Sequence, residues 1–303
     1  MKQEEPAKLG DYEVHKAWEG FASIRQISSG EIMHSRTAPM EEARKLYVEQ
    51  SNLAERLRDQ IATQPLVIWD VGLGAGANAM AAIECYERSA TARSLSIVSF
   101  ENDLDSLRLA LAHERDFPYL RADAVRALLD EGKWQSPEMP GLCWILVVGD
   151  FLETMISASP PDVIFYDMFS TRSSAELWTL AVFRKISAAC AGRAAELFTY
   201  TCSTANRAAL LAAGFHVARG RNAGEKIETT IALTPAALRA SFSGTRDLLG
   251  DDWLAKWNRS AAKFPTDVPA DERSAFEQII RGHEQFRKSP GPERLHSTTM
   301  ISH

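Results

Sequence analysis

Four acidic side chains stand at or beside the ends of apolar runs in this sequence: Asp70, Glu101, Asp150 and Asp167. The carboxyl ends of parallel strands meet at one edge of a sheet, and open α/β sheets bind their ligands at that edge. We therefore expect the four carboxylates to face a common site. For Asp167, a solvated turn residue is the alternative to a catalytic or ligand-holding carboxylate.

A glycine-rich segment, WDVGLGAGANAM at residues 69–80, follows an apolar run and precedes a helical pattern. Gly72, Gly74 and Gly76 lack side chains, so the backbone can turn tightly there and approach a ligand. This context predicts a nucleotide-type cofactor loop. With Ala77 in its last position the loop also fits the dinucleotide fingerprint, so it does not separate NAD from S-adenosylmethionine by itself.

The acids beside the loop favour S-adenosylmethionine. A carboxylate at Asp70 attracts the cationic sulfonium and amino groups of that cofactor, whereas it repels a pyrophosphate. Glu101 is placed to accept hydrogen bonds from both ribose hydroxyls. Asp150 is expected either to accept a hydrogen bond from the adenine amino group or to cap the segment that follows it.

The elements that position these residues are short apolar runs alternating with segments of helical period, which is typical of a mainly parallel α/β sheet. Two later strands, around Gly224, have no helix between them and so indicate a closing antiparallel hairpin, because a parallel pair needs a crossover. That ending is typical of the Rossmann-like fold of class I S-adenosylmethionine-dependent methyltransferases, and less so of dinucleotide dehydrogenases. The predicted strands are residues 66–71, 95–101, 143–150, 162–167 and 195–201, and the predicted helices include residues 173–190 and 205–213.

The flanking regions carry patterns of their own. Residues 21–35 resemble a hairpin turning at Ser29-Gly30, and residues 39–57 read as a helix. Trp253 and Trp257 lie one helical turn apart and are expected to pack against the core. We expect an N-terminal elaboration over residues 1–60, a methyltransferase core over residues 61–235, and a helical C-terminal extension over residues 236–303 that forms a lid or cap.

The composition limits the class of protein. Of 303 residues, 34 are Lys or Arg and 40 are Asp or Glu, and the net charge of -6 argues against a chain that coats nucleic acid by bulk electrostatics. The four cysteines have neither paired nor metal-like spacing, so we expect no disulfide and no metal. No signal peptide or membrane span is evident, which predicts a cytoplasmic protein. The oligomeric state is not determined by the sequence.

Taken together, these motifs resemble the methyltransferase module of the MnmC family, the tRNA 5-methylaminomethyl-2-thiouridine methyltransferases, in the stand-alone form without the FAD oxidase domain. The resemblance covers about residues 30–233. It rests on Gly72-Leu73-Gly74-Ala75-Gly76-Ala77-Asn78, Ser99-Phe100-Glu101, Val148-Gly149-Asp150, Asp167-Met168-Phe169, Glu176-Leu177-Trp178, Thr201 with Arg207, and Ala213-Gly214-Phe215.

The resemblance implies methyl transfer from S-adenosylmethionine to the exocyclic amine of 5-aminomethyl-2-thiouridine at the wobble position, in the anticodon region of tRNA. It adds Asn78 to the cofactor-binding residues. An alkylamine with a pKa near ~10 is mostly protonated at neutral pH, so a neighbouring group must hold it and help remove its proton. Asp167 is assigned this role; because a carboxylate is a weak base, orientation of the amine is the safer part of the assignment.

Contacts with the nucleic acid are expected from two groups of side chains. Phe169 and Trp178 are placed to stack on the flipped-out wobble base, with packing in the core as the alternative. Arg219, Arg221 and Lys226 form a basic cluster that can meet phosphates, with a solvated hairpin face as the alternative.

The sequence departs from the family near the expected substrate pocket. Met168 replaces a glycine, SSAELW at residues 173–178 replaces a proline-containing segment, and GEKIETT at residues 224–230 replaces a more basic one. A methyltransferase acting on a small-molecule amine is therefore the main alternative. An NAD-dependent oxidoreductase and a non-catalytic cofactor-binding module are the others.

Overall fold

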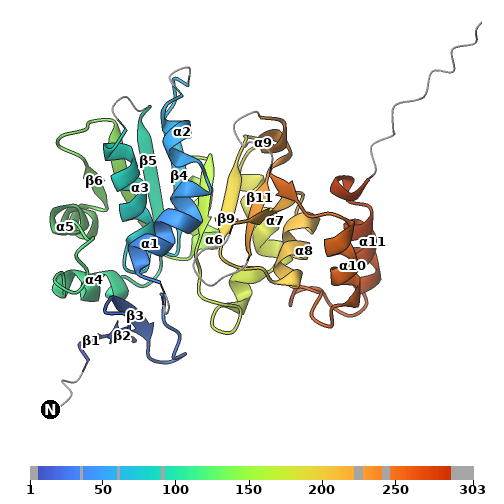
Figure 1. The fold of residues 1–303 in the computed structure, drawn as a ribbon, viewed down its shortest axis with the longest axis horizontal. Helices are drawn as coiled ribbons and strands as arrows, with labels where there is room; N and C mark the ends of the chain where they lie inside the picture. The colour runs from blue at the N-terminus through green and yellow to red at the C-terminus, as the bar shows by residue number, and fades with distance from the viewer. Residues whose placement is uncertain are drawn as a thin grey trace, which may run out of the picture.

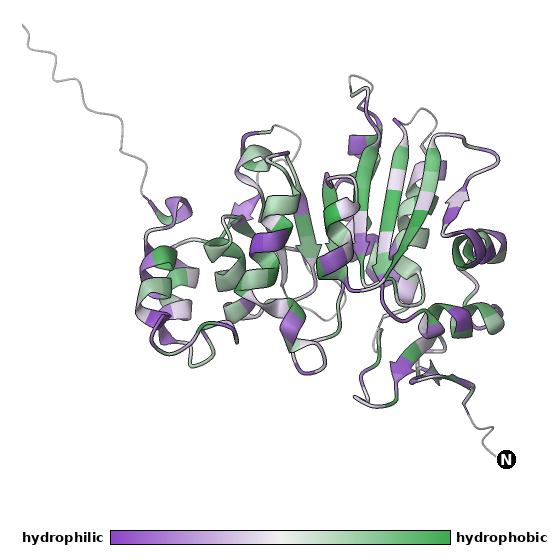
Figure 2. Cartoon of the chain, turned by 180° about the vertical axis from the view of Figure 1, so that it is seen from behind, coloured by the Kyte–Doolittle hydropathy of each residue, from purple (hydrophilic) through white to green (hydrophobic). Residues whose placement is uncertain are grey.

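A central β-sheet covered by helices on both faces organises the computed structural model, which describes residues 6–34, 37–59, 62–89, 93–221, 228–240 and 246–287 (Figure 1). Hydrophobic residues are concentrated along the central strands, and hydrophilic ones on the outer helices (Figure 2). The strands are β1 (Lys8–Leu9), β2 (Tyr12–Lys16), β3 (Ala22–Gln26), β4 (Leu66–Val71), β5 (Leu95–Glu101), β6 (Lys133–Gln135), β7 (Leu142–Val148), β8 (Val163–Tyr166), β9 (Glu196–Thr199), β10 (His216–Gly220), β11 (Thr229–Leu233) and β12 (Asp247–Leu248). The α-helices are α1 (Pro39–Ala43), α2 (Leu53–Leu57), α3 (Ala77–Glu87), α4 (Asp105–Ala112), α5 (Ala122–Glu131), α6 (Phe151–Thr154), α7 (Leu180–Ala189), α8 (Thr204–Ala212), α9 (Pro235–Arg239), α10 (Asp251–Arg259) and α11 (Arg273–Arg281).

The large sheet has the strand order β12-β10-β11-β9-β8-β4-β5-β7-β6 within the described residues. Strands β7, β5, β4, β8 and β9 are parallel to their neighbours in this series. Strand β11 lies between β9 and β10 and is antiparallel to both. The prediction of a mainly parallel sheet closed by an antiparallel hairpin is therefore confirmed, as is the position of each of the five parallel strands within two residues at either end.

The strands of the parallel part are apolar throughout because both of their faces are covered. Along β4, Leu66 and Ile68 pack into the cluster with α2, α3 and α5, whereas Val67, Trp69 and Val71 pack into the cluster with α6, α7 and α8. Asp70 breaks the run of apolar residues yet is completely buried. This strand leads directly into the glycine-rich loop.

The N-terminal region forms a second, three-stranded sheet in the order β1-β2-β3. The predicted turn is present, since Gly30 has a φ of +70° and its N–H donates to the Gln26 carbonyl at 2.9 Å. The second arm of the predicted hairpin pairs only briefly with β3, through the antiparallel bridge Arg25–Ile32 and the hydrogen bonds Gln26 N–H to Glu31 carbonyl and Met33 N–H to Ile24 carbonyl, at 2.8 and 3.0 Å. The main partner of β3 is β2. This sheet packs beside α4, at the lower left of Figure 1.

The predicted helix over residues 39–57 is interrupted. It consists of α1, a π-helical segment Arg44–Glu49 and then α2. Asn52 between the last two has a φ of +52°, a left-handed conformation that Asn tolerates better than most residues and that ends a right-handed helix. Tyr47, on the π-helical segment, is buried against Phe165 of β8.

The described part of the C-terminal extension is not a lid over the strand ends, which corrects that expectation. Its strand β12 joins the edge of the large sheet beside β10, and α10 and α11 pack at the far end from β7 (Figure 1). Trp253 and Trp257 stack at 6.4 Å between ring centroids and are buried with α7 and α8, as predicted. The extension therefore completes the hydrophobic core.

The four cysteines are all free thiols. Among the described residues, no helix has both the length and the apolar composition needed to cross a membrane.

Replacement of Trp257 by Ala is expected to lower the free energy of unfolding by about 3–5 kcal/mol, because it removes a completely buried indole and leaves a cavity. Trp18 is the matched control: its side chain is 99% exposed, so Trp18→Ala should change stability by less than about 0.5 kcal/mol. Urea unfolding followed by circular dichroism measures both. Equal effects of the two substitutions would contradict the packing described.

Candidate active site

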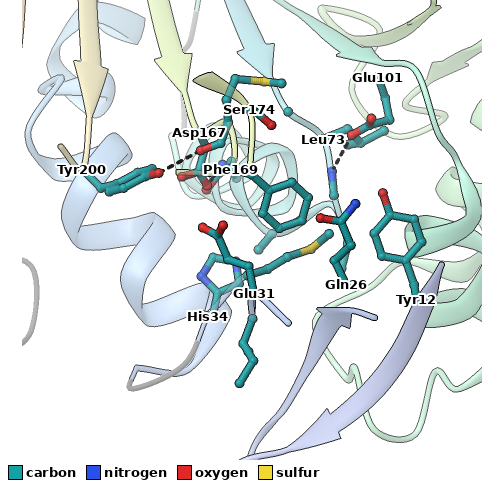
Figure 3. Close-up of a pocket in the computed structure, with 18 of the residues that line it drawn as sticks. Tyr12, Gln26, Glu31, His34, Leu73, Glu101, Asp167, Phe169, Ser174 and Tyr200 are labelled. Atoms are coloured by element: carbon teal, nitrogen blue, oxygen red, sulfur yellow. Dashed lines mark hydrogen bonds between the residues drawn. The ribbon is translucent and has the colours of Figure 1, made fainter. Parts of the chain in front are cut away.

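A cavity of about 600 Å³ lies between the carboxyl ends of the parallel strands and the N-terminal sheet. Its walls come from the glycine-rich loop after β4, the end of β5, the loop after β8, and the turn that follows β3. Tyr12 and Tyr200 face it from opposite sides, and the ring of Phe169 points toward its centre (Figure 3). A cavity is therefore present at the strand ends, and two of the four predicted carboxylates, Glu101 and Asp167, line it.

The glycine-rich loop has no room for side chains at two positions. Gly72 has a φ of +89°, and a Cβ there would lie 2.8 Å from the carbonyl oxygen of Asp167. Gly74 has a φ of +52°, and a Cβ there would lie 3.0 Å from the sulfur of Met33. The positive φ at both positions and the fixed backbone beside Gly72 favour glycine, and the loop lines the cavity with its backbone, as a cofactor loop requires.

Glu101 lines the cavity at the end of β5. One of its carboxylate oxygens accepts a hydrogen bond from the Gly74 N–H at 3.1 Å, and the other accepts from the N–H groups of Asn102 and Asp103 (Figure 3). Burial raises the pKa of Glu101, whereas these N–H groups oppose the rise. These hydrogen bonds hold the Glu101 carboxylate rigidly at the strand end, where the sequence predicts an acid that binds the ribose of the cofactor.

Asp70 does not line the cavity, contrary to the expectation that it meets the cofactor directly. Its side chain is completely buried beneath the loop, and one oxygen accepts a hydrogen bond from the Ser99 hydroxyl at 2.7 Å. Burial raises the pKa of Asp70 to about 7, opposed by Ser99 and reinforced by the charge of Asp167. Its role is to support the loop from below.

Asp150 follows the alternative interpretation that the sequence left open. Its carboxylate accepts a hydrogen bond from the Leu152 N–H at 2.7 Å and so caps α6. The side chain is exposed and is not among the residues that line the cavity. The helix cap is therefore present, and the adenine contact stays a prediction.

Asp167 lies in the cavity wall, half-buried, at the end of β8. One of its carboxylate oxygens accepts a hydrogen bond from the side-chain amide of Asn78 at 2.9 Å, and its backbone N–H donates to the Val71 carbonyl at 2.9 Å. The side-chain oxygen of Asn78 is buried and accepts no hydrogen bond within the described residues. It is an acceptor available to a cationic group at the cofactor loop.

Tyr200 lies on the Asp167 side of the cavity and was not predicted from the sequence. Its hydroxyl donates to the Met168 carbonyl at 2.9 Å. Burial, reinforced by the charge of Asp167, raises the pKa of Tyr200 above its ordinary value. The phenol therefore stays protonated at neutral pH and fixes the backbone immediately after Asp167.

The two predicted stacking aromatics separate in the structure. Phe169 lines the cavity and remains a candidate for stacking on a base. Trp178 is only 2% exposed, packs edge-on against Tyr166 and Tyr200, and donates its indole N–H to the Phe169 carbonyl at 2.7 Å. Trp178 thus supports the cavity wall from behind, and its predicted substrate contact is wrong.

The predicted basic cluster is not a phosphate site around Arg219. The Arg219 guanidinium forms ion pairs with Glu228 at 3.2 Å, with Asp247 at 3.5 Å and with Asp252, which together outweigh its charge. Arg221 is exposed at the end of β10 and does not line the cavity. Lys226 lies outside the described residues.

The N-terminal region contributes side chains to the cavity that sequence reasoning missed. Glu31 accepts hydrogen bonds from the N–H and hydroxyl of Ser170, at 2.9 and 3.0 Å, and from the Ser173 hydroxyl. His34 lies 3.2 Å from Glu42, nitrogen to oxygen. Chain order gives no signal for the Glu31 contacts, because they join the N-terminal region to the loop after β8, about 140 residues further along the chain.

The cavity is acidic. Its charge suits ligands with cationic groups, such as a sulfonium or an ammonium. The described part of the chain holds no group of three or more His, Cys, Asp or Glu side chains suited to a metal ion. The carboxylates in its wall, among the described residues, are Glu31, Glu42, Glu101, Asp167 and Glu176.

This arrangement of sheet, glycine loop and strand-end carboxylates is the fold of the class I S-adenosylmethionine-dependent methyltransferases. A family model described as "S-adenosyl-L-methionine-dependent methyltransferase" matches residues 138–235. The cofactor fits the residues present: the loop offers backbone at Gly72 and Gly74, Glu101 offers a fixed carboxylate, and Asn78 offers a buried acceptor. The prediction of S-adenosylmethionine as the cofactor is therefore confirmed.

The resemblance to the MnmC family is also confirmed. The chain is 29% identical over 268 residues to the tRNA 5-methylaminomethyl-2-thiouridine biosynthesis bifunctional protein MnmC of Stutzerimonas stutzeri, covering 84% of this chain and 39% of that protein. It is 28% identical to the Ectopseudomonas mendocina protein of the same name, covering 70% and 33%. The chain thus spans about a third to two fifths of these curated relatives.

A solved structure shares the fold. The crystal structure of MnmC2 from Aquifex aeolicus superimposes with a TM-score of 0.64 at 21% identity, covering 91% of this chain and 86% of that one.

The buried Asp70 makes a testable contribution to the pH dependence of stability. The folded state holds its proton up to about pH 7, whereas the unfolded state releases it near 3.8. Between these values the folded state binds more protons, so this group's contribution to stability falls as pH rises, by at most about 1.4 kcal/mol per pH unit, and the loss is complete above pH 7.

Asp70→Asn, which does not titrate, should therefore gain stability relative to the wild type as pH rises from 5 to 7 in urea unfolding. If the difference in the free energy of unfolding between the two proteins is constant from pH 5 to 7, Asp70 is ionised in the folded state and the prediction is wrong.

Proposed function

We propose that this protein transfers a methyl group from S-adenosylmethionine to the exocyclic amine of 5-aminomethyl-2-thiouridine at the wobble position of tRNA. The observation that carries the proposal is the Asp167 carboxylate, held by Asn78 beside the cofactor loop in an acidic cavity. The similarity to MnmC proteins supports the identity of the substrate, because their names specify biosynthesis of 5-methylaminomethyl-2-thiouridine in tRNA, which is the product of this methyl transfer.

The shape and charge of the cavity suit a base that carries an amine. Phe169 offers an aromatic face toward the cavity centre, on which an unstacked base can lie (Figure 3). Asp167 begins the same loop two residues earlier and offers a carboxylate for an ammonium group. A base stacked on Phe169 would thus bring its side-chain amine toward Asp167.

Bound S-adenosylmethionine supplies a methyl group that a nucleophilic nitrogen can accept. The task of this chain's residues is to present that nitrogen with a free lone pair. Asp167 accepts a hydrogen bond from the protonated amine, aligns it, and takes up one of its protons, which frees the nitrogen lone pair before the new N–C bond forms. Asn78 keeps the carboxylate in place by donating a hydrogen bond to it, and Tyr200 fixes the adjacent backbone by donating to the Met168 carbonyl.

The cellular test is mass spectrometry of wobble nucleosides from cells that lack this gene. The 5-aminomethyl form should accumulate at the expense of the methylated form, and complementation should restore the methylated form. An unchanged nucleoside profile would contradict the proposal. Methylation of small amines by the purified protein would then favour the alternative of a metabolite methyltransferase.

Asp167→Asn should lower kcat by about 10²-fold or more, because it removes the proton acceptor. Its affinity for S-adenosylhomocysteine, measured by calorimetry, should stay within about threefold, since an Asn oxygen can still accept the hydrogen bond from Asn78. Asp150→Asn is the matched control, since it alters an acid at the same sheet edge that lies outside the cavity. Full turnover by Asp167→Asn, or equal losses in both variants, would remove Asp167 from the reaction.

A further inference from the structure

Arg172 is a cation at the cavity without a counter-charge. It lies in the loop after β8 and lines the cavity, and its side chain makes no hydrogen bond or ion pair with any described residue. The other basic side chain among the described lining residues, His34, lies 3.2 Å from Glu42, nitrogen to oxygen. The cavity wall holds several carboxylates, yet none of them pairs with Arg172. Its guanidinium is therefore available for an external anion.

The loop that carries Arg172 is held in place on both sides of it. Ser170 and Ser173 donate hydrogen bonds to Glu31 of the N-terminal region. The N–H groups of Ser173 and Ser174 donate to the Ser170 carbonyl, both at 2.9 Å, which closes a tight turn around Arg172. The backbone is thus fixed while the side chain of Arg172 is exposed at the cavity edge. This is the arrangement of a preformed binding group.

The charge distribution indicates where a nucleotide's phosphate can lie. Carboxylates deep in the cavity, such as Asp167 and Glu101, attract the cationic amine and repel a phosphate. A nucleotide that places its base on Phe169 must therefore keep its phosphates at the edge. Arg172 lies three residues after Phe169, and a guanidinium binds phosphate oxygens through paired hydrogen bonds.

We propose that Arg172 binds a backbone phosphate of the nucleotide whose base enters the cavity, and so selects a nucleic-acid substrate over a free amine. This proposal rests on the proposed function and deepens it. The carboxylate of S-adenosylmethionine is the other anion within reach, and the experiment below separates the two.

The test compares two substrates that carry the same amine: an anticodon stem-loop RNA containing 5-aminomethyl-2-thiouridine, and the free nucleoside, which has no phosphate. For Arg172→Gln, the KM for the RNA should rise about 10-fold more than the KM for the nucleoside, as expected for the loss of one charged hydrogen-bonding group. The dependence of log(kcat/KM) for the RNA on log salt concentration should become shallower by about 0.7, the value for one phosphate contact on a single strand.

Arg184→Gln is the matched control. Arg184 is exposed on α7 and does not line the cavity, so its replacement removes the same charge from a different surface. Arg172→Lys, which keeps the charge but not the paired geometry, should recover part of the RNA affinity.

Three outcomes would overturn the assignment: equal losses on RNA and nucleoside, equal losses in Arg172→Gln and Arg184→Gln, or a weaker affinity of Arg172→Gln for S-adenosylhomocysteine that accounts for the whole effect. Failure of the proposed function gives a different result. In that case the wild-type protein methylates neither substrate, or the nucleoside alone, and both proposals are overturned. If Arg172→Gln keeps the full RNA activity of the wild type, only the proposal for Arg172 is overturned.

Discussion

The direct contact between the loop after β4 and the end of β8 is the constraint on which the site depends. Gly72 approaches the Asp167 carbonyl so closely that a Cβ would lie 2.8 Å from it, and Asn78 donates to the Asp167 carboxylate at 2.9 Å. The cofactor loop and the proposed acceptor carboxylate therefore form one rigid unit. Positioning of this kind is what brings a nucleophile and a methyl donor into register.

The rest of the molecule supports that unit from three directions. Asp70 lies beneath the loop, with Ser99 and the indole of Trp144 extending the buried hydrogen-bonded chain at 2.7 and 2.8 Å. Trp178 backs the loop after β8. The N-terminal region covers the cavity through Glu31, which joins it to Ser170. The small sheet is thus part of the site.

Sequence patterns predicted the features that depend on local order. The glycine-rich loop, Glu101 and the parallel strands with their closing hairpin follow from residues adjacent in the chain, because buried strands and tight loops impose strong local patterns. Asp167 was recognised for the same reason, as a charge at the end of an apolar strand.

Most of the failures depend on partners distant in the sequence, whereas Asp150 is explained by a local helix cap on Leu152. Asp70 and Asp150 have the same strand-end pattern as Glu101, yet one is buried under the loop and the other caps α6. Arg219 was read as available for phosphate, but its partners Asp247 and Asp252 are about 30 residues away in the chain. A charge pattern shows that a residue is polar; only the tertiary structure shows whether its charge is already neutralised.

The most direct test of the account is a crystal structure with S-adenosylhomocysteine and an anticodon stem-loop RNA carrying 5-aminomethyl-2-thiouridine. The account predicts that the product cofactor lies along the loop from Gly72 to Asn78, and that the amine nitrogen lies within about 2.6–3.2 Å of a carboxylate oxygen of Asp167. An amine bound elsewhere in the cavity, with Asp167 contacting only Asn78, would contradict it.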